Sequence, residues 1–194
     1  MKTALLLSGG MDSIALAYWK KPDLAITIDY GQRAAKAEIY ASSKICKKLN
    51  ICHRIISIDC KDLGSGDMST TKAIDLAPTS DWWPYRNQLL ITLSAMQCIA
   101  NNINTILIGT VASDSSHIDG TKAFISKINA LIFMQEGNIK VDAPAIEMTT
   151  LELIKNTNTI TPVSDWAHSC HKSNYICGRC RGCNKYFETL EQLK

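Results

Sequence analysis

Short apolar segments alternate with longer amphipathic ones along most of this chain, and this alternation limits the possible folds more than any other feature. Apolar runs of strand length, typical of buried β-strands, occur at residues 3–7, 24–28, 54–58, 105–108 and 139–141. Apolar residues at helical spacing fill the intervals at 11–20, 34–49, 86–101, 119–133 and 149–156, where Thr149 or Thr150 is expected to cap the last helix. This order predicts an α/β fold, a doubly wound parallel five-stranded sheet with helices on both faces.

The length of 194 residues suits one domain with a full core and a small appendage. We expect residues 1–158 to form the sheet domain and residues 159–194 to form a small C-terminal metal-binding segment packed on it. Residues 59–84 show no clear periodicity, and a connection of that length inside a compact domain is usually a functional loop.

The composition excludes several classes of protein. With 46% hydrophobic and 20% charged residues, the chain is expected to be globular rather than disordered. No apolar run approaches the roughly 20 residues that span a bilayer, and the apolar start Met1–Leu7 gives way to Ser8 too soon for a signal peptide. We therefore predict a cytoplasmic protein with no membrane partner. The net charge of +3 is too small to indicate nucleic-acid binding by itself.

Polar, glycine-containing segments follow three of the predicted strands, at residues 8–13, 29–33 and 109–119. In open parallel sheets, ligands bind beyond the carboxyl ends of the strands, at the point where the strand order reverses. These three segments are therefore expected to surround the ligand.

The first of these segments, Ser8-Gly9-Gly10-Met11-Asp12-Ser13, joins a strand to a helix. Two glycines allow the backbone to turn sharply towards a ligand, and the amide groups and dipole at a helix N-terminus attract anions. The hydroxyls of Ser8 and Ser13 would add donors, and Asp12 beside phosphate would need a cation such as Mg²⁺. Taken alone, the segment is equally compatible with an ordinary turn in which Asp12 or Ser13 caps the helix.

The same segment is similar to the SGGxDS pyrophosphate loop (PP-loop) of the N-type ATP pyrophosphatases, which split ATP into AMP and pyrophosphate. It lacks the Gly-Lys-Ser/Thr ending of a Walker loop, so cleavage at the γ-phosphate is not expected. The position of the segment, directly after the first strand, strengthens this interpretation over that of a plain helix cap.

Four of the eight cysteines lie close together near the C-terminus, at Cys170, Cys177, Cys180 and Cys183. Two overlapping C-x2-C elements and a nearby fourth thiolate predict tetrahedral ligation of one Zn²⁺ ion, with Arg179, Arg181 and Lys185 partly offsetting its anionic charge. A site closed by four cysteines leaves no open coordination position, so its role would be structural. The alternatives are an iron–sulfur cluster, a redox C-x2-C pair, or replacement of one cysteine by His168 or His171.

The PP-loop, the cysteine cluster and the segments between them resemble the 7-cyano-7-deazaguanine synthase family. The matching segments are Leu7–Ser13, Asp29-Tyr30-Gly31-Gln32-Arg33, Pro84-Tyr85-Arg86-Asn87 and the four cysteines, with weaker likeness at Gly109–Asp119 and Ala143-Pro144. The resemblance covers nearly the whole chain. It implies an adenine nucleotide alpha-hydrolase-like fold with a C-terminal zinc site, and a homodimer, because family members are often homodimers.

The resemblance also implies an ATP-dependent, AMP-forming ligase in queuosine biosynthesis. Such an enzyme converts 7-carboxy-7-deazaguanine and ammonia into the nitrile 7-cyano-7-deazaguanine. ATP first adenylates the carboxylate, which makes it a good electrophile, and ammonia displaces AMP to give an amide. A second ATP adenylates the amide oxygen, and loss of AMP leaves the nitrile; each adenylation releases pyrophosphate.

Carried over to this sequence, the resemblance assigns roles to individual residues. The nucleotide, with its Mg²⁺, is expected to contact Leu7, Ser8, Gly9, Gly10, Met11, Asp12, Ser13, Asp29, Tyr30 and Arg33. Asp12 and Arg86 are expected to be catalytic, Arg86 by neutralising phosphate charge, with Arg33 as a second candidate for that role. Without the resemblance, Arg86 is compatible with a solvated residue at a helix start. Asn87 and Asp119 are expected to bind the deazapurine substrate.

One segment departs from the family pattern. The family usually has a Tyr-Pro-Asp-Cys-Arg stretch after the fourth strand, where this chain has His117-Ile118-Asp119-Gly120-Thr121. Asp119 is retained, but the arginine that could pair with a carboxylate through two hydrogen bonds is missing. Trp82 and Trp83 could stack on a base instead, although at least one of them is expected in the core.

This departure leaves other functions open. A divergent paralogue could use the same adenylation to make an amide, or to couple the deazapurine to an amine on a protein or nucleic acid. A tRNA-modifying PP-loop enzyme would generally need a reactive cysteine, and the clustered cysteines here are assigned to a metal. A non-catalytic zinc-ribbon binding module would need a strongly basic face.

Overall fold

The computed structural model describes residues 1–114 and 117–194, and its centre is a five-stranded parallel sheet in the order β3-β2-β1-β4-β5. The strands are β1 (Thr3–Leu6), β2 (Leu24–Asp29), β3 (Cys52–Ser57), β4 (Thr105–Leu107) and β5 (Lys140–Asp142). The helices are α1 (Met11–Lys20), α2 (Ala35–Leu49), α3 (Arg86–Ala100), α4 (Lys122–Phe133), α5 (Thr150–Thr157), α6 (Ile160–Trp166) and α7 (Arg181–Glu191). The predicted fold class is confirmed, and the predicted strands and helices agree with these bounds to within a few residues.

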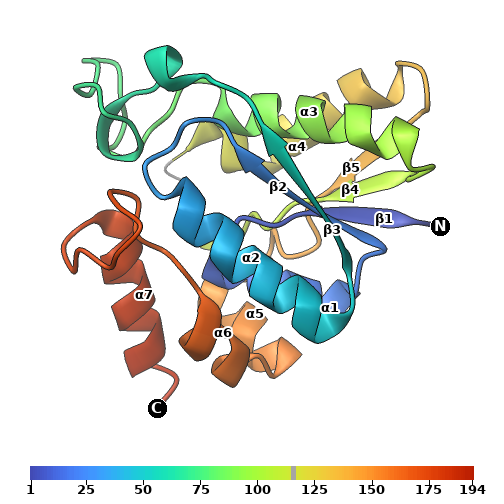
Figure 1. Cartoon of the computed structure of the whole chain (residues 1–194). Helices are drawn as coiled ribbons and strands as arrows, with labels where there is room; N and C mark the ends of the chain where they lie inside the picture. The colour runs from blue at the N-terminus through green and yellow to red at the C-terminus, as the bar shows by residue number, and fades with distance from the viewer. Residues whose placement is uncertain (115–116) are drawn as a thin grey trace.

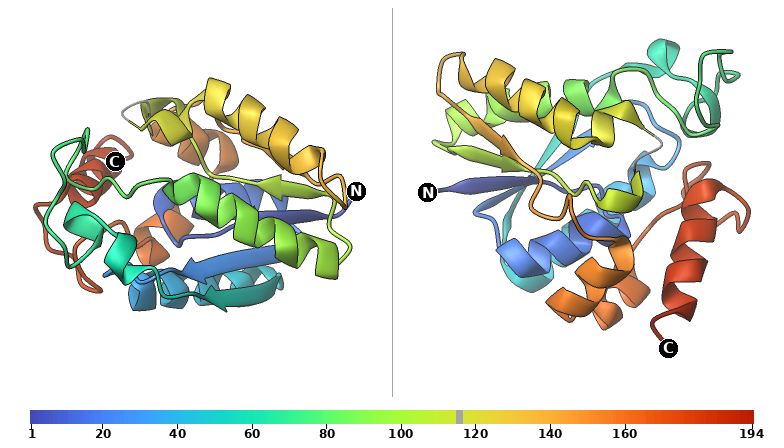
Figure 2. Two further views of the ribbon diagram at one scale, coloured as in Figure 1. Left: turned by 90° about the horizontal axis from the view of Figure 1, so that it is seen from above. Right: turned by 180° about the vertical axis from the view of Figure 1, so that it is seen from behind.

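Helices cover both faces of the sheet (Figures 1 and 2). Helices α3 and α4 pack on one face around a core that includes Ile91, Ile106 and Ile128, while α1, α2, α5 and α6 pack on the other. Strands β1, β2 and β4 are largely buried on both faces, which is why their sequences read as continuous hydrophobic runs. Strand β3, at the edge of the sheet, is mostly exposed, and β5 buries only Val141. None of the helices in residues 1–114 and 117–194 is long and apolar enough to cross a membrane.

Three local features differ from the sequence-based expectations. Helix α4 starts at Lys122 rather than at residue 119, because Ile118–Gly120 form a single 3₁₀ turn and the Thr121 hydroxyl accepts a hydrogen bond from the amide of Phe124. Helix α3, expected to be buried, leaves Met96 and part of its surface exposed. Helices α6 and α7 were not predicted, since their residues were assigned only to a metal-binding segment.

The strand order reverses at β1, whose neighbours are β2 on one side and β4 on the other. A crevice therefore opens beyond the carboxyl ends of β1 and β4. Residues 59–84, irregular apart from two single 3₁₀ turns, and helix α7 both lie at this end of the sheet (Figures 1 and 2). The expected loop and the C-terminal segment thus border the predicted ligand position.

The C-terminal segment is attached to the sheet domain by apolar packing. Tyr186 of α7 and Val163 of α6 belong to the same buried cluster as Leu5 of β1. The Tyr186 hydroxyl also donates a hydrogen bond of 3.0 Å to the carbonyl oxygen of Ser164. This packing fixes where the remaining side chains of α7 lie relative to the crevice.

Candidate functional site

The segment Ser8–Ser13 connects β1 to α1 as a tight loop at the reversal point. Gly9 has a φ of +74°, and a Cβ atom there would come within 2.8 Å of the Glu38 carbonyl oxygen. Only glycine is compatible with both constraints. The hydroxyls of Ser8 and Ser13 lie 3.2 Å apart, and the Ser13 hydroxyl donates to the carbonyl oxygen of Gly10. The loop therefore directs two hydroxyls and the first amides of α1 towards the crevice.

A second glycine, Gly109, brings the end of β4 against this loop. A Cβ atom on Gly109 would lie 3.2 Å from the amide nitrogen of Ser13 and 3.3 Å from its Cα atom. These distances are tighter than ordinary van der Waals contacts, so a larger side chain would press on the loop. The ends of β1 and β4 thus lie against each other at the base of the crevice.

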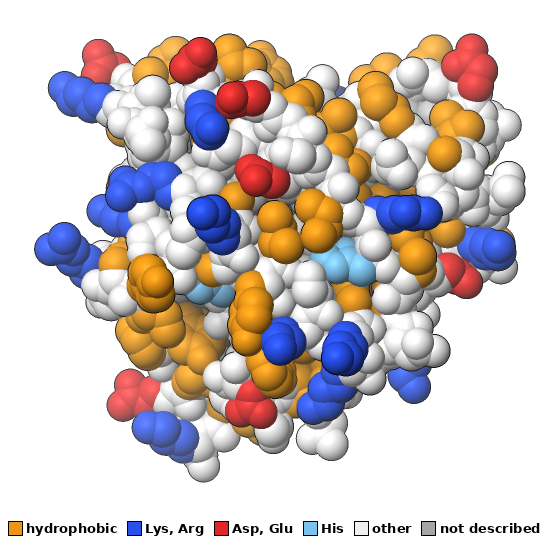
Figure 3. All heavy atoms as spheres, viewed as in Figure 1, with side chains coloured by type: hydrophobic (Ala, Val, Ile, Leu, Met, Phe, Trp, Pro, Cys, Tyr) orange, Lys and Arg blue, Asp and Glu red, His pale blue; other side chains and the backbone are white. Residues whose placement is uncertain are grey.

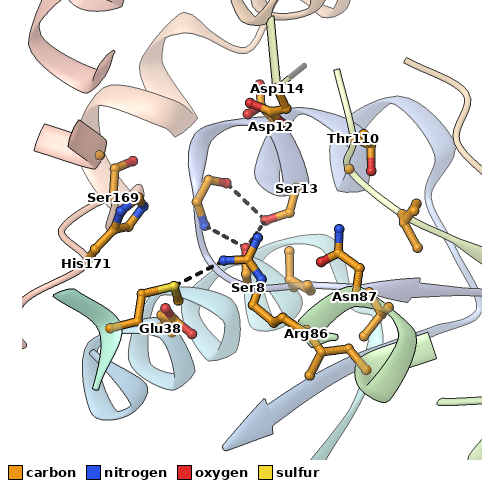
Figure 4. A pocket seen from close by; sticks show the side chains of 18 of the residues that line it. Ser8, Asp12, Ser13, Glu38, Arg86, Asn87, Thr110, Asp114, Ser169 and His171 are labelled. Carbon is orange, nitrogen blue, oxygen red and sulfur yellow. Dashed lines mark hydrogen bonds between the residues drawn. The ribbon is translucent and has the colours of Figure 1, made fainter. Parts of the chain in front are cut away.

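The crevice is a cavity of about 300 Å³ that residues far apart in the sequence line together. Figure 4 shows Ser8, Asp12, Ser13, Arg86 and Asn87 around the cavity, with Arg86 beside Ser8. The 59–84 connection, the loop after β4 and the C-terminal segment also contribute, through Met68, Asp81, Asp114, His117, Ser169, His171, Arg181 and Lys185. This volume lies within the range of small-molecule sites in proteins.

Asp12 is buried at the start of α1 and faces a lysine from the opposite end of the chain. The ammonium group of Lys185 lies 3.1 Å from Asp12 Oδ2 and 3.0 Å from Asp114 Oδ1. Burial raises the pKa of Asp12, although the charge of Lys185 opposes this shift. The second carboxylate oxygen, Asp12 Oδ1, is buried and has no hydrogen-bond partner among the residues described. Asp12 and Asp114 together could therefore hold a hard cation such as Mg²⁺.

Arg86, the first residue of α3, lies in the interior of the cavity with Tyr30 and Asp119 near it. Burial disfavours the guanidinium charge, but the nearby acidic groups outweigh this effect and raise the pKa of Arg86. Arg86 donates to the sulfur atom of Met68 at 3.1 Å. Because sulfur is a weak acceptor, the Arg86 guanidinium is suited to bind an anionic ligand in the cavity.

Asn87 lines the cavity, and Asp119 holds it in place. The carboxylate of Asp119 accepts a hydrogen bond from the Asn87 amide nitrogen at 3.1 Å, and the Asn87 side chain donates to the Asp119 carbonyl oxygen at 3.0 Å. Asp119 is not among the residues that line the cavity. Its predicted role in binding substrate thus stays a prediction, and the contacts indicate that it positions Asn87.

A second carboxylate, Asp81 from the 59–84 connection, sits among three basic groups. His171 Nδ1 lies 3.1 Å from Asp81, the guanidinium of Arg181 lies 3.5 Å away, and His117 Nε2 lies 3.8 Å away. Burial would raise the pKa of Asp81, but hydrogen bonds from His117, His171 and Thr79 hold it well below its usual range. The ionised Asp81 thereby joins the long connection to the C-terminal segment across the mouth of the cavity.

Several predicted nucleotide contacts lie outside the cavity lining. Arg33 is exposed, and the Asp29 carboxylate accepts a hydrogen bond from the Gly31 amide at 3.0 Å. Gly9 shapes the loop without lining the cavity. Trp83 is buried and packs edge-on against Tyr30 with their ring centroids 4.9 Å apart, so it is the tryptophan that belongs to the core.

The four clustered cysteines fit a tetrahedral metal site. Their sulfur atoms all lie within 4.8 Å of one another. The Cys177–Cys183 and Cys170–Cys180 sulfur pairs are 3.9 and 4.0 Å apart. Sulfur atoms placed tetrahedrally about 2.3 Å from Zn²⁺ are separated by about 3.8 Å, close to these values. The cluster could therefore hold a metal ion.

The neighbouring histidines point to other partners. His168 Nε2 lies 3.0 Å from the Ser173 carbonyl oxygen, and His171 approaches Asp81. Backbone amides, that of Arg179 first, lower the pKa of Cys177 to about 6, which favours the thiolate that a metal requires. Arg181 and Lys185, expected to offset the charge of the cluster, instead contact carboxylates of the cavity.

Sequence reasoning missed a set of cavity residues that includes Glu38, Asp81, Asp114, His171 and Lys185. Glu38 lies only six residues beyond Gln32, in the segment that carries the family resemblance, and that proximity was an available signal. Lys185 and His171 gave no comparable signal. They reach the cavity because the C-terminal segment packs beside it through Tyr186.

A doubly wound parallel sheet with an SGGxDS loop at its reversal point defines a nucleotide-binding α/β protein of the PP-loop class. The family model described as "Queuosine biosynthesis protein QueC" matches residues 2–194, and the chain belongs to this family.

Sequence relatives of similar length support this assignment. The 7-cyano-7-deazaguanine synthase of Chlorobaculum parvum is 32% identical over 202 residues, covering 94% of this chain and 88% of the relative. That of Methanosarcina mazei is 27% identical over 209 residues, covering 94% and 90%. NMN synthetase from Francisella tularensis has a similar fold, with a TM-score of 0.52 at 17% identity over 99% of this chain and 76% of that one. These similarities support an enzyme connected with queuosine precursor synthesis.

Proposed function

We propose that this protein is an ATP-dependent ligase that converts 7-carboxy-7-deazaguanine and ammonia into 7-cyano-7-deazaguanine. The acid and then the amide would be adenylated, with release of AMP and pyrophosphate at each step. The observation that carries the proposal is the joining of the PP-loop, Arg86 and Asn87 in a single cavity at the reversal point of the sheet.

The loop geometry supports binding of the β- and γ-phosphates, which leave together as pyrophosphate. Ser8 and Ser13 hydroxyls and the α1 amides supply neutral donors, and Arg86, which lines the same cavity, supplies a positive charge. Pyrophosphate is a better leaving group when its developing negative charge is held by such donors. The α-phosphate would then face the rest of the cavity, where an acceptor carboxylate can attack it.

Asp12 and Asp114 are the residues proposed to hold Mg²⁺, which would neutralise phosphate charge when ATP is bound. Lys185 now lies between these two carboxylates, at 3.1 and 3.0 Å. We propose that Lys185 moves towards the pyrophosphate when the metal occupies the carboxylates. Asp12 would thereby organise the nucleotide, and Lys185 would stabilise the leaving group.

The substrate acid carries a negative charge, and two arginines line the cavity, Arg86 and Arg181. Arg181 comes from the C-terminal segment and lies 3.3 Å from His117 Nε2, in the part of the chain where the family arginine is replaced. We propose that Arg181 takes over recognition of the substrate carboxylate, with Asn87 contacting the purine.

We further propose that the cysteine cluster holds one structural Zn²⁺ ion and that residues 159–194 act as a separate small unit on the sheet domain of residues 1–158. A cytoplasmic homodimer would fit this proposal. Figure 3 shows Lys and Arg side chains interspersed with hydrophobic and acidic ones on one face of the molecule.

The test is mass spectrometry of zinc-loaded protein incubated with Mg-ATP, 7-carboxy-7-deazaguanine and ammonium. The proposal requires the nitrile, with two AMP formed for each product molecule. The Asp12→Ala variant should form no AMP while keeping its fold and metal content. AMP without nitrile would indicate an amide product or a macromolecular acceptor, and absence of AMP from the wild type would refute the proposal.

A further inference from the structure

Glu38, on the first turn of α2, is a carboxylate of the cavity that the proposed adenylation chemistry does not use. It is half-buried beside the PP-loop, and its backbone carbonyl oxygen limits the space at Gly9. Figure 4 shows Glu38 on the side of the cavity that also holds Ser8 and Arg86. Glu38 lies next to the loop that is proposed to bind phosphate. A carboxylate would repel that phosphate, so a separate role for Glu38 is worth seeking.

Glu38 differs from the other carboxylates that line the described cavity because it has no ion-pair partner. Asp12 and Asp114 lie within 3.1 Å of Lys185, and Asp81 lies among His171 and two other basic groups. Glu38 forms no ion pair within 4.0 Å in the part of the chain that the structure describes. Its carboxylate is therefore the one in this lining that remains available to a small cationic ligand.

A neutral donor holds Glu38 in place. Gln32 is buried, and its side-chain amide donates to Glu38 Oε2 at 2.8 Å and to the Ile28 carbonyl oxygen at 3.0 Å. The Gln32 side-chain oxygen accepts a hydrogen bond from the Tyr30 amide. These three bonds fix the carboxylate to the end of β2, and Oε1 accepts no hydrogen bond from the residues that the structure describes.

The charged and titratable groups that face Glu38 come from three parts of the chain. Arg86 approaches from α3, His171 from the C-terminal segment, and Asp29 and Tyr30 from the end of β2. Burial raises the pKa of Glu38, and this effect outweighs the positive charges of His171 and Arg86. A carboxylate with a raised pKa is a stronger proton acceptor than one in water.

The proposed reaction, on which this inference rests, has a requirement that such a carboxylate meets. At neutral pH nearly all ammonia is present as ammonium, which has no lone pair and cannot attack a carbonyl carbon. We propose that Glu38 binds ammonium in the cavity and accepts one of its protons, so that ammonia is generated beside the adenylated substrate.

The step balances as written. Ammonium transfers a proton to the Glu38 carboxylate, which gives ammonia and the neutral acid. The nitrogen lone pair forms a bond to the carbonyl carbon, the bond from that carbon to the AMP oxygen breaks, and AMP leaves with the electron pair. The nitrogen then releases one further proton to solvent to give the neutral amide, and Glu38 loses its proton to solvent before the next turnover.

Hydroxylamine provides the discriminating probe, because it is an uncharged nucleophile at neutral pH and needs no proton removed before it attacks. The experiment compares the wild type, Glu38→Gln, Glu38→Asp and, as a matched control, Glu136→Gln, which makes the same chemical change at an exposed residue outside the cavity. AMP release and product formation are measured with Mg-ATP and 7-carboxy-7-deazaguanine at varied ammonium or hydroxylamine concentration, with circular dichroism and metal content as checks of folding.

For Glu38→Gln, kcat/KM for ammonium is expected to fall by about 100-fold or more, the usual contribution of a general base. Hydroxylamine-dependent AMP release should change by less than about threefold, Glu38→Asp should retain part of the ammonium activity, and Glu136→Gln should match the wild type. An equal loss with both nucleophiles would overturn the inference by assigning Glu38 to the nucleotide or the fold. Unchanged ammonium activity would overturn it while leaving the proposed function intact, and a wild type that forms no AMP would overturn both.

Discussion

Replacing Lys185 by methionine is expected to destabilise the protein through the carboxylates that the lysine contacts. Lys185 lies 3.1 Å from Asp12 and 3.0 Å from Asp114, and its side chain is 32% exposed against 14% for Asp12. Methionine preserves most of the apolar volume, so the loss is mainly electrostatic. Asp12 would then keep a buried negative charge with no cation beside it.

The magnitude follows from the partial burial of this cluster. Removing one partner of a fully buried ion pair costs about 3–5 kcal/mol, and an exposed pair contributes about 0.2–1 kcal/mol. A lysine that is one-third exposed beside a largely buried aspartate lies between these limits. We expect the free energy of unfolding to fall by about 2 kcal/mol, equivalent to a loss of about 4–8 °C in Tm for a chain of this size.

The pH dependence of this loss identifies its cause. The pKa of Asp12 is already raised by burial in the folded protein, and removal of Lys185 would raise it further. A carboxyl whose pKa is higher in the folded than in the unfolded state opposes folding when ionised, and the penalty disappears as pH falls through the folded-state pKa. The difference in stability between wild type and variant should therefore be largest near pH 7 and decrease on acidification.

Urea unfolding of the metal-loaded proteins at several pH values measures this effect. Lys194→Met, at an exposed C-terminal position, makes the same chemical change and serves as the control. If the Lys185 variant lost no more stability than this control, or lost the same amount at every pH, the electrostatic argument would be wrong.

Three further changes test the metal cluster, the PP-loop and the α5 cap. Cys180→Ser removes a predicted metal ligand that also accepts a hydrogen bond from the Cys183 amide. Bound zinc measured by mass spectrometry should fall from about one per chain to none, and Tm should fall with it. A variant that retained zinc would contradict the assignment. Gly109→Ala places a Cβ 3.2 Å from the Ser13 amide nitrogen and should lower the free energy of unfolding by about 1–3 kcal/mol. The Kd for ATP should rise by about tenfold, and an unchanged Kd measured by calorimetry would contradict this prediction. Thr149→Ala removes the capping box of α5 and should lower stability in urea by about 1 kcal/mol with AMP formation unchanged, whereas a loss of AMP formation at unchanged stability would disprove a purely structural role.

The fold could be predicted from the sequence because its signals are local. Strands β1, β2 and β4 are apolar and largely buried on both faces, and the spacing of Ala41 and Ile45 marks the buried face of α2. The cap of α5 is Thr149, one of the two residues predicted, and its side chain forms a reciprocal capping box with Glu152 within four residues. Such features need no information from distant parts of the chain.

The C-terminal half of the cavity could not be predicted because its contacts are not local. Lys185 meets Asp12 across 173 positions of sequence, and Asp81 meets Arg181 across 100. No periodicity or spacing in either segment specifies which residues of the other it will face. The metal cluster was visible as a motif, but the direction in which it turns α7 depends on the packing of Tyr186 against the core.

These long-range contacts also govern when a nascent chain acquires a complete site. The PP-loop emerges from the ribosome first, whereas Arg181 and Lys185 follow after almost the whole sheet has been translated. Domains generally fold in the order of synthesis, so the sheet can assemble while these residues are still inside the exit tunnel. A chain interrupted before α7 would retain the phosphate loop without its basic counterpart. The basic side of the cavity can therefore form only after residues 181–185 have been translated.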